Sequence, residues 1–203
     1  MLIDVLPATK AKMRILNTIY NNRDINIRNI IKLSKTSPNL AVDYVNKLEK
    51  YNIAKIKKIG GTKKNYVKAV SFNFKAPLSR FFYAIIEISR KEELIKKYAI
   101  LKPFIAQIEN IKSGIIVLIY GSYARFAADK ESDVDLWVVG NINKTVKRDI
   151  EEIFVTLPVK YSIGIETKKE FLKKIRDAIH QNILRDKVII KNENAFFEIP
   201  AKL

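Results

Sequence analysis

The chain contains no cysteine, so disulfide bonds and thiolate metal sites are excluded. Long apolar runs are also missing: the two longest, residues 81–86 and residues 115–120, are six residues each. A membrane-spanning helix needs about 20 apolar residues. The first ten residues, MLIDVLPATK, lack the basic-then-apolar order of a signal peptide. We therefore expect a soluble, cytoplasmic protein with no membrane partner.

Acidic residues are scarce in the first part of the chain only. Residues 1–75 hold 16 Lys and Arg against 4 Asp and Glu, whereas residues 76–203 hold 22 against 17. A one-sided cationic excess favours a polyanionic partner, because each Lys or Arg set against a phosphate releases condensed counterions. The Lys-rich composition of heat-adapted proteins would explain many lysines, but not a shortage of acids in one part. The charge therefore predicts a nucleic-acid partner for residues 1–75.

Apolar residues recur at helical spacing in three segments of the first part. Before the third segment, Ser37 suits an N-cap and Pro38 suits the first helical position, where its missing N–H costs nothing. Two strand-like segments then flank a Gly60-Gly61 turn. This order resembles the winged helix-turn-helix domain of small prokaryotic regulators, which we predict for residues 1–75. The three helical segments are residues 10–21, 27–33 and 38–48, and the two strands are residues 53–59 and 66–74.

The predicted third helix and hairpin carry the residues expected to bind duplex DNA. Asn39, Asn46 and Lys47 lie on the outward face of the helix, and Asn can pair with adenine in the major groove. Lys63 and Lys64 fall at the hairpin tip, where they would reach phosphates. The alternative is that these are solvated faces and that the domain contacts a protein.

A strongly apolar segment, FFYAIIEI, opens the stretch between the two parts. We expect helices over residues 76–88 and 91–111 and treat residues 76–112 as a helical connector. The apolar face of this connector must be covered. The connector could link the two domains, cap the second domain or form a homodimer interface. The sequence does not decide among these.

The remaining stretch, residues 113–203, alternates apolar strands with amphipathic helices, which is typical of a small α/β or α+β sheet domain. We predict a first strand that passes directly into Gly121, and a second strand that begins with two aspartates. The predicted strands are residues 115–119, 133–139, 159–166, 187–190 and 195–199, and the predicted helices are residues 145–156 and 168–184.

Two short motifs of this second domain carry the chemistry. Asp133 and Asp135 are two residues apart on a strand, so both carboxylates leave the same face. Paired carboxylates suit Mg²⁺ or Mn²⁺, whose coordination is completed by water and by substrate phosphates. Gly121 lets the backbone approach a phosphate, Ser122 supplies a hydroxyl and an N–H, and Arg125 adds positive charge near such phosphates.

In their spacing these motifs resemble the nucleotidyltransferase superfamily that includes DNA polymerase beta, and most closely its minimal, toxin–antitoxin-associated branch. The resemblance implies an α+β protein: a winged helix-turn-helix, a helical connector and a polymerase-beta-like domain with a small mixed sheet. It further implies an enzyme that transfers a nucleoside monophosphate from an NTP to an acceptor hydroxyl, with two metal ions. The matching residues are Gly121, Ser122, Ala124, Arg125, Ser132, Asp133, Asp135 and Leu136.

The sequence departs from this family at two positions. Phe126 stands where the branch has glycine, and its ring could narrow the nucleotide entrance or offer a surface for base stacking. The third carboxylate of the family falls nearest Ser162 or Gly164, neither of which is acidic. Glu166 lies on the same strand face, one or two steps beyond. We therefore take Asp133, Asp135 and Glu166 as the candidate catalytic acids.

Three functions are compatible with the sequence. The first is transfer of a nucleoside monophosphate to a protein or nucleic-acid hydroxyl, with a winged helix that binds DNA. The second is a DNA-binding transcription regulator whose second domain binds nucleotide but is weakly active or inactive. The third is an RNA-modifying enzyme whose basic part holds its substrate. The first two functions differ in whether a third carboxylate completes the catalytic site.

Overall fold

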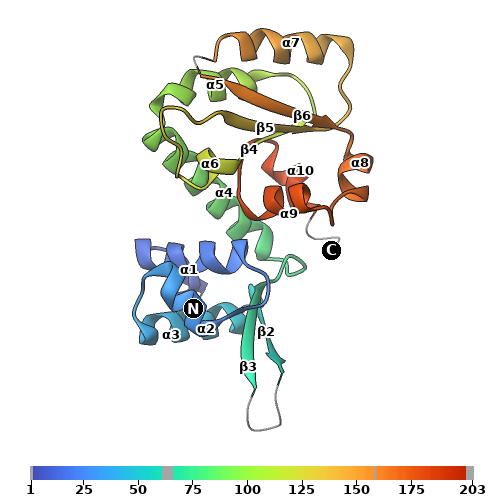
Figure 1. Ribbon diagram of the computed structural model, residues 1–203. Coiled ribbons are helices and arrows are strands. Elements are labelled where there is room, and N and C mark those ends of the chain that lie inside the picture. The colour runs from blue at the N-terminus through green and yellow to red at the C-terminus, as the bar shows by residue number, and fades with distance from the viewer. Residues whose placement is uncertain (1, 61–65, 158, 200–203) are drawn as a thin grey trace. The chain divides into compact units, whose positions relative to one another are not determined.

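The computed structural model describes residues 2–60, 66–157 and 159–199 (Figure 1). The chain divides into two compact units, Met1–Ile86 and Glu87–Leu203. Each unit has its own small sheet, so the protein is a mixed α+β structure. In the described part of the chain, no helix is long and apolar enough to cross a membrane.

The first unit begins with a short 3-10 turn and three helices whose starts are defined by side-chain caps. Thr9, Asn26 and Ser37 each accept a hydrogen bond from a backbone N–H in the first turn of the helix that follows. Such caps satisfy N–H groups that have no partner inside the helix. The predicted helical segments are confirmed. The elements are η1 (Leu2–Val5), α1 (Lys10–Asn21), α2 (Ile27–Ser34) and α3 (Pro38–Lys50).

A three-stranded antiparallel sheet completes the first unit, in the order β1-β3-β2. The two predicted strands are present but shorter than expected, and Lys63 and Lys64 lie outside the described residues. The ring of Tyr20 contacts the rings of Phe72 and Tyr83, which join the helices, the sheet and the start of α4 in one core. The strands are β1 (Ile25–Asn26), β2 (Ala54–Ile59) and β3 (Val67–Phe72).

The helices after the hairpin differ from the prediction. α4 (Ser79–Lys97) is one helix that runs through the predicted break near residue 89, and the boundary between the two units falls inside it. The chain breaks later, at η2 (Ala99–Leu101), before α5 (Lys102–Asn110). The physical reason is Pro103: a proline has no N–H to donate and its ring clashes with the carbonyl four residues earlier.

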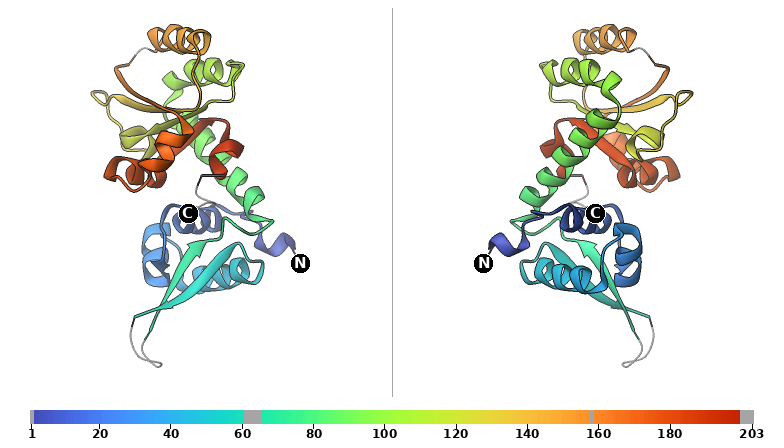
Figure 2. Two further views of the ribbon diagram at one scale, coloured as in Figure 1. Left: turned by 90° about the vertical axis from the view of Figure 1, so that its right-hand side faces the viewer. Right: turned by 90° about the vertical axis from the view of Figure 1, so that its left-hand side faces the viewer.

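The second unit is built on a four-stranded mixed sheet in the order β6-β5-β4-β7. β4 is antiparallel to both of its neighbours, whereas β5 and β6 are parallel. One face packs on α5 and α7 and the other on α8 to α10, as Figures 1 and 2 show. The elements are β4 (Ile116–Tyr120), α6 (Gly121–Ala124), β5 (Val134–Val139), α7 (Lys144–Val155), β6 (Tyr161–Glu166) and β7 (Lys187–Lys191).

The C-terminal part corrects two further predictions. The single helix expected over residues 168–184 is two helices, because Asp177 adopts an extended backbone and starts a new one. Ile179, in the second of these helices, is 45% exposed. The strand expected over residues 195–199 is wrong, since most of that segment lies in a short helix that follows a left-handed turn at Asn192. These helices are α8 (Lys168–Lys173), α9 (Ala178–Arg185) and α10 (Glu193–Phe197).

Candidate functional site

An open pocket of about 430 Å³ lies where β4 ends and β5 begins. It contains the five residues that the sequence predicted for nucleotide and metal binding, so the fold brings all of them together. Residues from α9 and from the segment before β7 complete its wall. The lining residues are Tyr120, Gly121, Ser122, Arg125, Ser132, Asp133, Asp135, Ile179, Asn182 and Asp186.

Gly121 is required here for two independent reasons. It follows β4 directly, and its backbone has a φ of 72°, in the left-handed region that favours glycine. A Cβ atom added to it would lie 2.2 Å from Oδ2 of Asp135, which is far inside van der Waals contact. The antiparallel register explains this closeness, because Tyr120 pairs with Asp135. The glycine thus allows α6 to start against the carboxylate of β5.

Asp133 and Asp135 present two carboxylates to the same pocket. Oδ1 of Asp135 accepts a hydrogen bond of 2.7 Å from Oγ of Ser162 on the neighbouring strand. Within the described residues, neither carboxylate forms an ion pair with a Lys, Arg or His. Two carboxylates without a cationic partner fit a hard cation such as Mg²⁺ that shares its coordination with phosphates.

The hydroxyl of Tyr120 lies beside this pair. Burial, and then the negative charge of Asp135, raise the pKa of Tyr120 above its ordinary value of 10.0, although a hydrogen bond with Ser162 opposes this. Tyr120 is therefore a neutral phenol at physiological pH. It can donate a hydrogen bond at the pocket wall, but it is not a nucleophilic phenolate.

The positive side of the pocket comes from Arg125, which is about half exposed. Its guanidinium lies 3.8 Å from the carboxylate of Asp186, and Asp186 also pairs with Arg185 at 3.1 Å. Sequence reasoning missed Asp186, because nothing in its local sequence indicates a site. It reaches the pocket because β7, which starts at the next residue, pairs with β4 beside α6.

A buried arginine of α4 holds the two pocket walls in place. Arg90 donates from Nη2 to the carbonyl of Ala124, at the end of α6, and from Nε to the carbonyl of Lys187 in β7. Its guanidinium also lies over the ring of Phe126, 5.8 Å from the ring centre. Phe126 has a φ of 57° and packs against the hydrophobic core instead of lining the pocket. Neither expected effect of its ring is supported by its place in the structure, because the ring is not among the residues that line the pocket.

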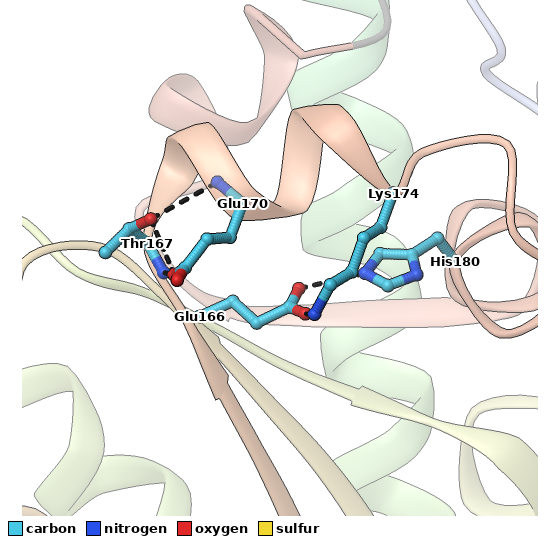
Figure 3. Close-up of polar contacts among 5 residues, drawn as sticks. All are labelled: Glu166, Thr167, Glu170, Lys174 and His180. Carbon is cyan, nitrogen blue, oxygen red and sulfur yellow. Dashed lines mark hydrogen bonds and ion pairs between the residues drawn. The ribbon is translucent and has the colours of Figure 1, made fainter.

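Glu166 does not reach this pocket. In the parallel pairing of β5 and β6 it lies level with Val139, four residues beyond Asp135, which corresponds to about 13 Å along a strand. Its carboxylate instead contacts Nζ of Lys174 at 2.5 Å and Nε2 of His180 at 2.9 Å (Figure 3). The prediction that Glu166 supplies the third catalytic acid is corrected: it links β6 to α9 and to the turn after α8.

We predict that Glu166→Gln destabilises the protein in a pH-dependent way. Burial opposes ionisation of Glu166, but hydrogen bonds with His180 and Lys174 outweigh it and hold its pKa below the ordinary value of 4.5. A lowered folded-state pKa contributes stability above the unfolded pKa, and this stability is lost as the pH falls through the folded value. The variant should lose about 1–3 kcal/mol of unfolding free energy at pH 7.

Urea unfolding at several pH values between neutral and acid measures this effect. The difference between wild type and Glu166→Gln should begin to shrink as the pH falls below about 4.5, the ordinary pKa of the unfolded chain, and should be lost once the pH is below the lowered folded-state pKa. Glu152→Gln, an exposed position on α7, is the matched control and should change stability little. A difference that does not depend on pH would contradict the assignment.

Part of the second unit, including this pocket, is similar to known proteins. Residues 100–190 match the family model of the nucleotidyltransferase domain. A protein of Methanocaldococcus jannaschii, named "putative protein adenylyltransferase", is 29% identical over 92 residues, which are 42% of this chain and 89% of that protein. The matched stretch begins before α5 and ends in β7, and it contains every residue that lines the pocket. Over this stretch the second unit is therefore similar to nucleotidyltransferase domains.

Proposed function

We propose that residues 87–203 transfer a nucleoside monophosphate from an NTP to the hydroxyl of a macromolecular acceptor. The observation that carries this proposal is the packing of Gly121 against Asp135, which sets the start of α6 and two carboxylates in one pocket. The name of the Methanocaldococcus relative favours ATP as the donor and a protein as the acceptor.

Four of the pocket residues have a direct role in this proposal. Asp133 and Asp135 hold Mg²⁺ or Mn²⁺, which supplies positive charge to the phosphates and to the leaving group. Ser122 and Arg125 bind the phosphate oxygens. The acceptor oxygen bonds to the α-phosphorus while the bond from the α-phosphorus to the bridging oxygen breaks, and pyrophosphate leaves. The fold thus contributes positioning and charge, the two main demands of phosphoryl-group chemistry.

The test is incubation of the full chain with cell lysate, Mg²⁺ or Mn²⁺, and ATP that carries the label in either its α- or its γ-phosphate. We expect macromolecule-bound label from α-labelled ATP only, because the γ-phosphate leaves with pyrophosphate. Equal labelling from γ-labelled ATP would indicate a kinase and contradict the proposal. The other three NTPs, tested in the same way, define the preferred base.

A second function is favoured by one observation. In the parts of the chain that the structure describes, no group of three or more His, Cys, Asp or Glu side chains is arranged to hold a metal ion. A site with two acids suits nucleotide binding better than two-metal catalysis. The protein would then be a DNA-binding regulator that binds NTP. It would bind NTP through Asp133 and Asp135 but label no macromolecule in the lysate.

For the first unit we propose a winged helix-turn-helix that binds duplex DNA. The support is the order of three helices and a β2–β3 hairpin, together with the cationic excess of residues 1–75. On α3, Asn39 and Asn46 are exposed, as a helix that reads the major groove requires. Lys47 is partly buried and pairs with Asp43 at 2.8 Å. Nζ of Lys47 donates a hydrogen bond to the Asp43 carboxylate, and this bond raises the pKa of Lys47, which therefore stays charged.

We predict that the full chain binds duplex DNA with a steep salt dependence. Lys63→Ala/Lys64→Ala should weaken binding and flatten the slope of log affinity against log salt by about two, since each lost phosphate contact removes about 0.9. Fluorescence anisotropy at several salt concentrations measures this slope. Lys169→Ala/Lys173→Ala, on α8, removes the same charge from the second unit and should leave the slope unchanged. Absence of binding even at low salt would identify the first unit as a protein-contact module.

A further inference from the structure

We propose that Ser162 is an acceptor in its own right, and that the protein transfers a nucleoside monophosphate to its own Ser162 hydroxyl. This inference rests on the proposed function of the pocket and names a substrate for it. The reaction requires three features of the structure: a hydroxyl beside the paired carboxylates, a hydrogen-bond acceptor that orients it, and access to solvent.

The sheet register supplies the first two requirements. In the parallel pairing of β5 and β6, Ser162 lies directly opposite Asp135, so both side chains project from the same face. Oγ of Ser162 donates to Oδ1 of Asp135 at 2.7 Å. A hydroxyl within hydrogen-bond reach of a carboxylate is the arrangement in which serine acts as a nucleophile. Ser162 is exposed on the edge strand of the sheet, which meets the third requirement.

The other hydroxyls near the carboxylates are less suited to be the acceptor. Ser132 donates to Oδ1 of Asp129 at 2.8 Å and accepts from the N–H of Asp129, so it holds the loop before β5. Tyr120 is partly buried, with a raised pKa. Ser122 is assigned to the phosphates. The hydroxyl of Tyr161, the preceding residue on β6, belongs to the opposite face, where its ring contacts Phe154.

The step balances without a further reactant. Oγ of Ser162 bonds to the α-phosphorus of the NTP, the bond from the α-phosphorus to the bridging oxygen breaks, and pyrophosphate leaves. The hydroxyl proton is released to water, while the hydrogen bond to Asp135 orients Oγ. Because the acceptor is held beside the site, the reaction avoids the entropy loss of bringing in a second molecule. The product places a phosphodiester anion against Asp135, so a modified molecule should bind NTP more weakly.

The experiment is intact-mass measurement and peptide mapping of the full chain after incubation with ATP and Mg²⁺ or Mn²⁺. We expect one nucleoside monophosphate per molecule, on the peptide that contains Ser162. Ser162→Ala should lose it, and Ser162→Thr, which keeps a hydroxyl, should retain it. Tyr161→Phe removes a hydroxyl from the same strand but the opposite face and should be modified like wild type. Transfer within one molecule predicts a first-order rate that does not change with protein concentration.

Several outcomes would overturn the inference. Modification at another residue, or modification of Ser162→Ala at the wild-type rate, would exclude Ser162 as the acceptor. An unmodified wild type that still labels lysate proteins from α-labelled ATP would reject self-modification and leave the proposed function intact. A wild type that shows no NTP binding in calorimetry would reject both. Transfer onto Ser162 of an added Asp135→Asn copy would replace the intramolecular route with one between molecules.

Discussion

The paired substitution Asp133→Asn/Asp135→Asn is expected to lower nucleotide transfer by about a thousandfold, equivalent to roughly 4 kcal/mol of transition-state stabilisation. Both carboxylates open into the pocket, and neither has a Lys, Arg or His partner among the described residues. Amide groups of the same size remove the negative charge that would hold a divalent cation. Metal-dependent NTP binding should be lost together with transfer.

Calorimetric titration with ATP, in the presence and absence of Mg²⁺, measures the expected loss of metal-dependent nucleotide binding. The melting temperature of the variant should stay close to that of wild type, since the amides fit where the carboxylates lay. Asp149→Asn, a change of the same chemistry on α7 and outside the pocket, is the matched control. An unchanged ATP affinity in the paired variant would show that the nucleotide binds elsewhere.

Ser162→Asp is expected to raise activity and Gly164→Asp to destabilise the protein, although both place an acid near the position predicted for a third carboxylate. Ser162 is exposed and touches Asp135, so an aspartate there adds a third carboxylate to the site. A Cβ atom at Gly164 would instead lie 2.4 Å from two ring carbons of Trp137. We expect Ser162→Asp to increase transfer to added acceptors. Gly164→Asp should destabilise the second unit by about 3 kcal/mol or more, as overpacking does.

Melting temperatures with and without Mg²⁺ separate these effects. Without metal, the new carboxylate of Ser162→Asp repels Asp135 and should lower the melting temperature. Mg²⁺ should restore it, because a ligand that binds only the folded state stabilises that state. Ser162→Asn has the same size without the charge and should show no such metal response. If Ser162→Asn matched Ser162→Asp in both transfer and metal response, the third acid would have no role.

Much of this site could be predicted from the sequence, because its parts are local. Gly121 follows an apolar strand, Asp133 immediately precedes the next one, and Asp135 lies two residues further, inside that strand. Alternation along a strand is enough to place both aspartates on one face. The start of α3, with its N-cap Ser37 and with Pro38, could also be predicted from the sequence, because a helix cap depends on residues that are neighbours in the chain. The metal, the nucleotide and the DNA assigned to these residues stay predictions.

What depended on distant residues could only be decided by the tertiary structure. Side-chain alternation correctly placed Glu166 on the same strand face as Ser162. Which residue of the neighbouring strand lies opposite Glu166 is set by the register of strand pairing, and this register puts Glu166 beside Val139. Asp186 entered the pocket in the same way, through the pairing of β7 with β4. Side-chain alternation repeats every two residues along the whole strand, whichever residues of the neighbouring strand lie opposite. It therefore identifies the face of a residue but not the strand neighbour that the residue meets.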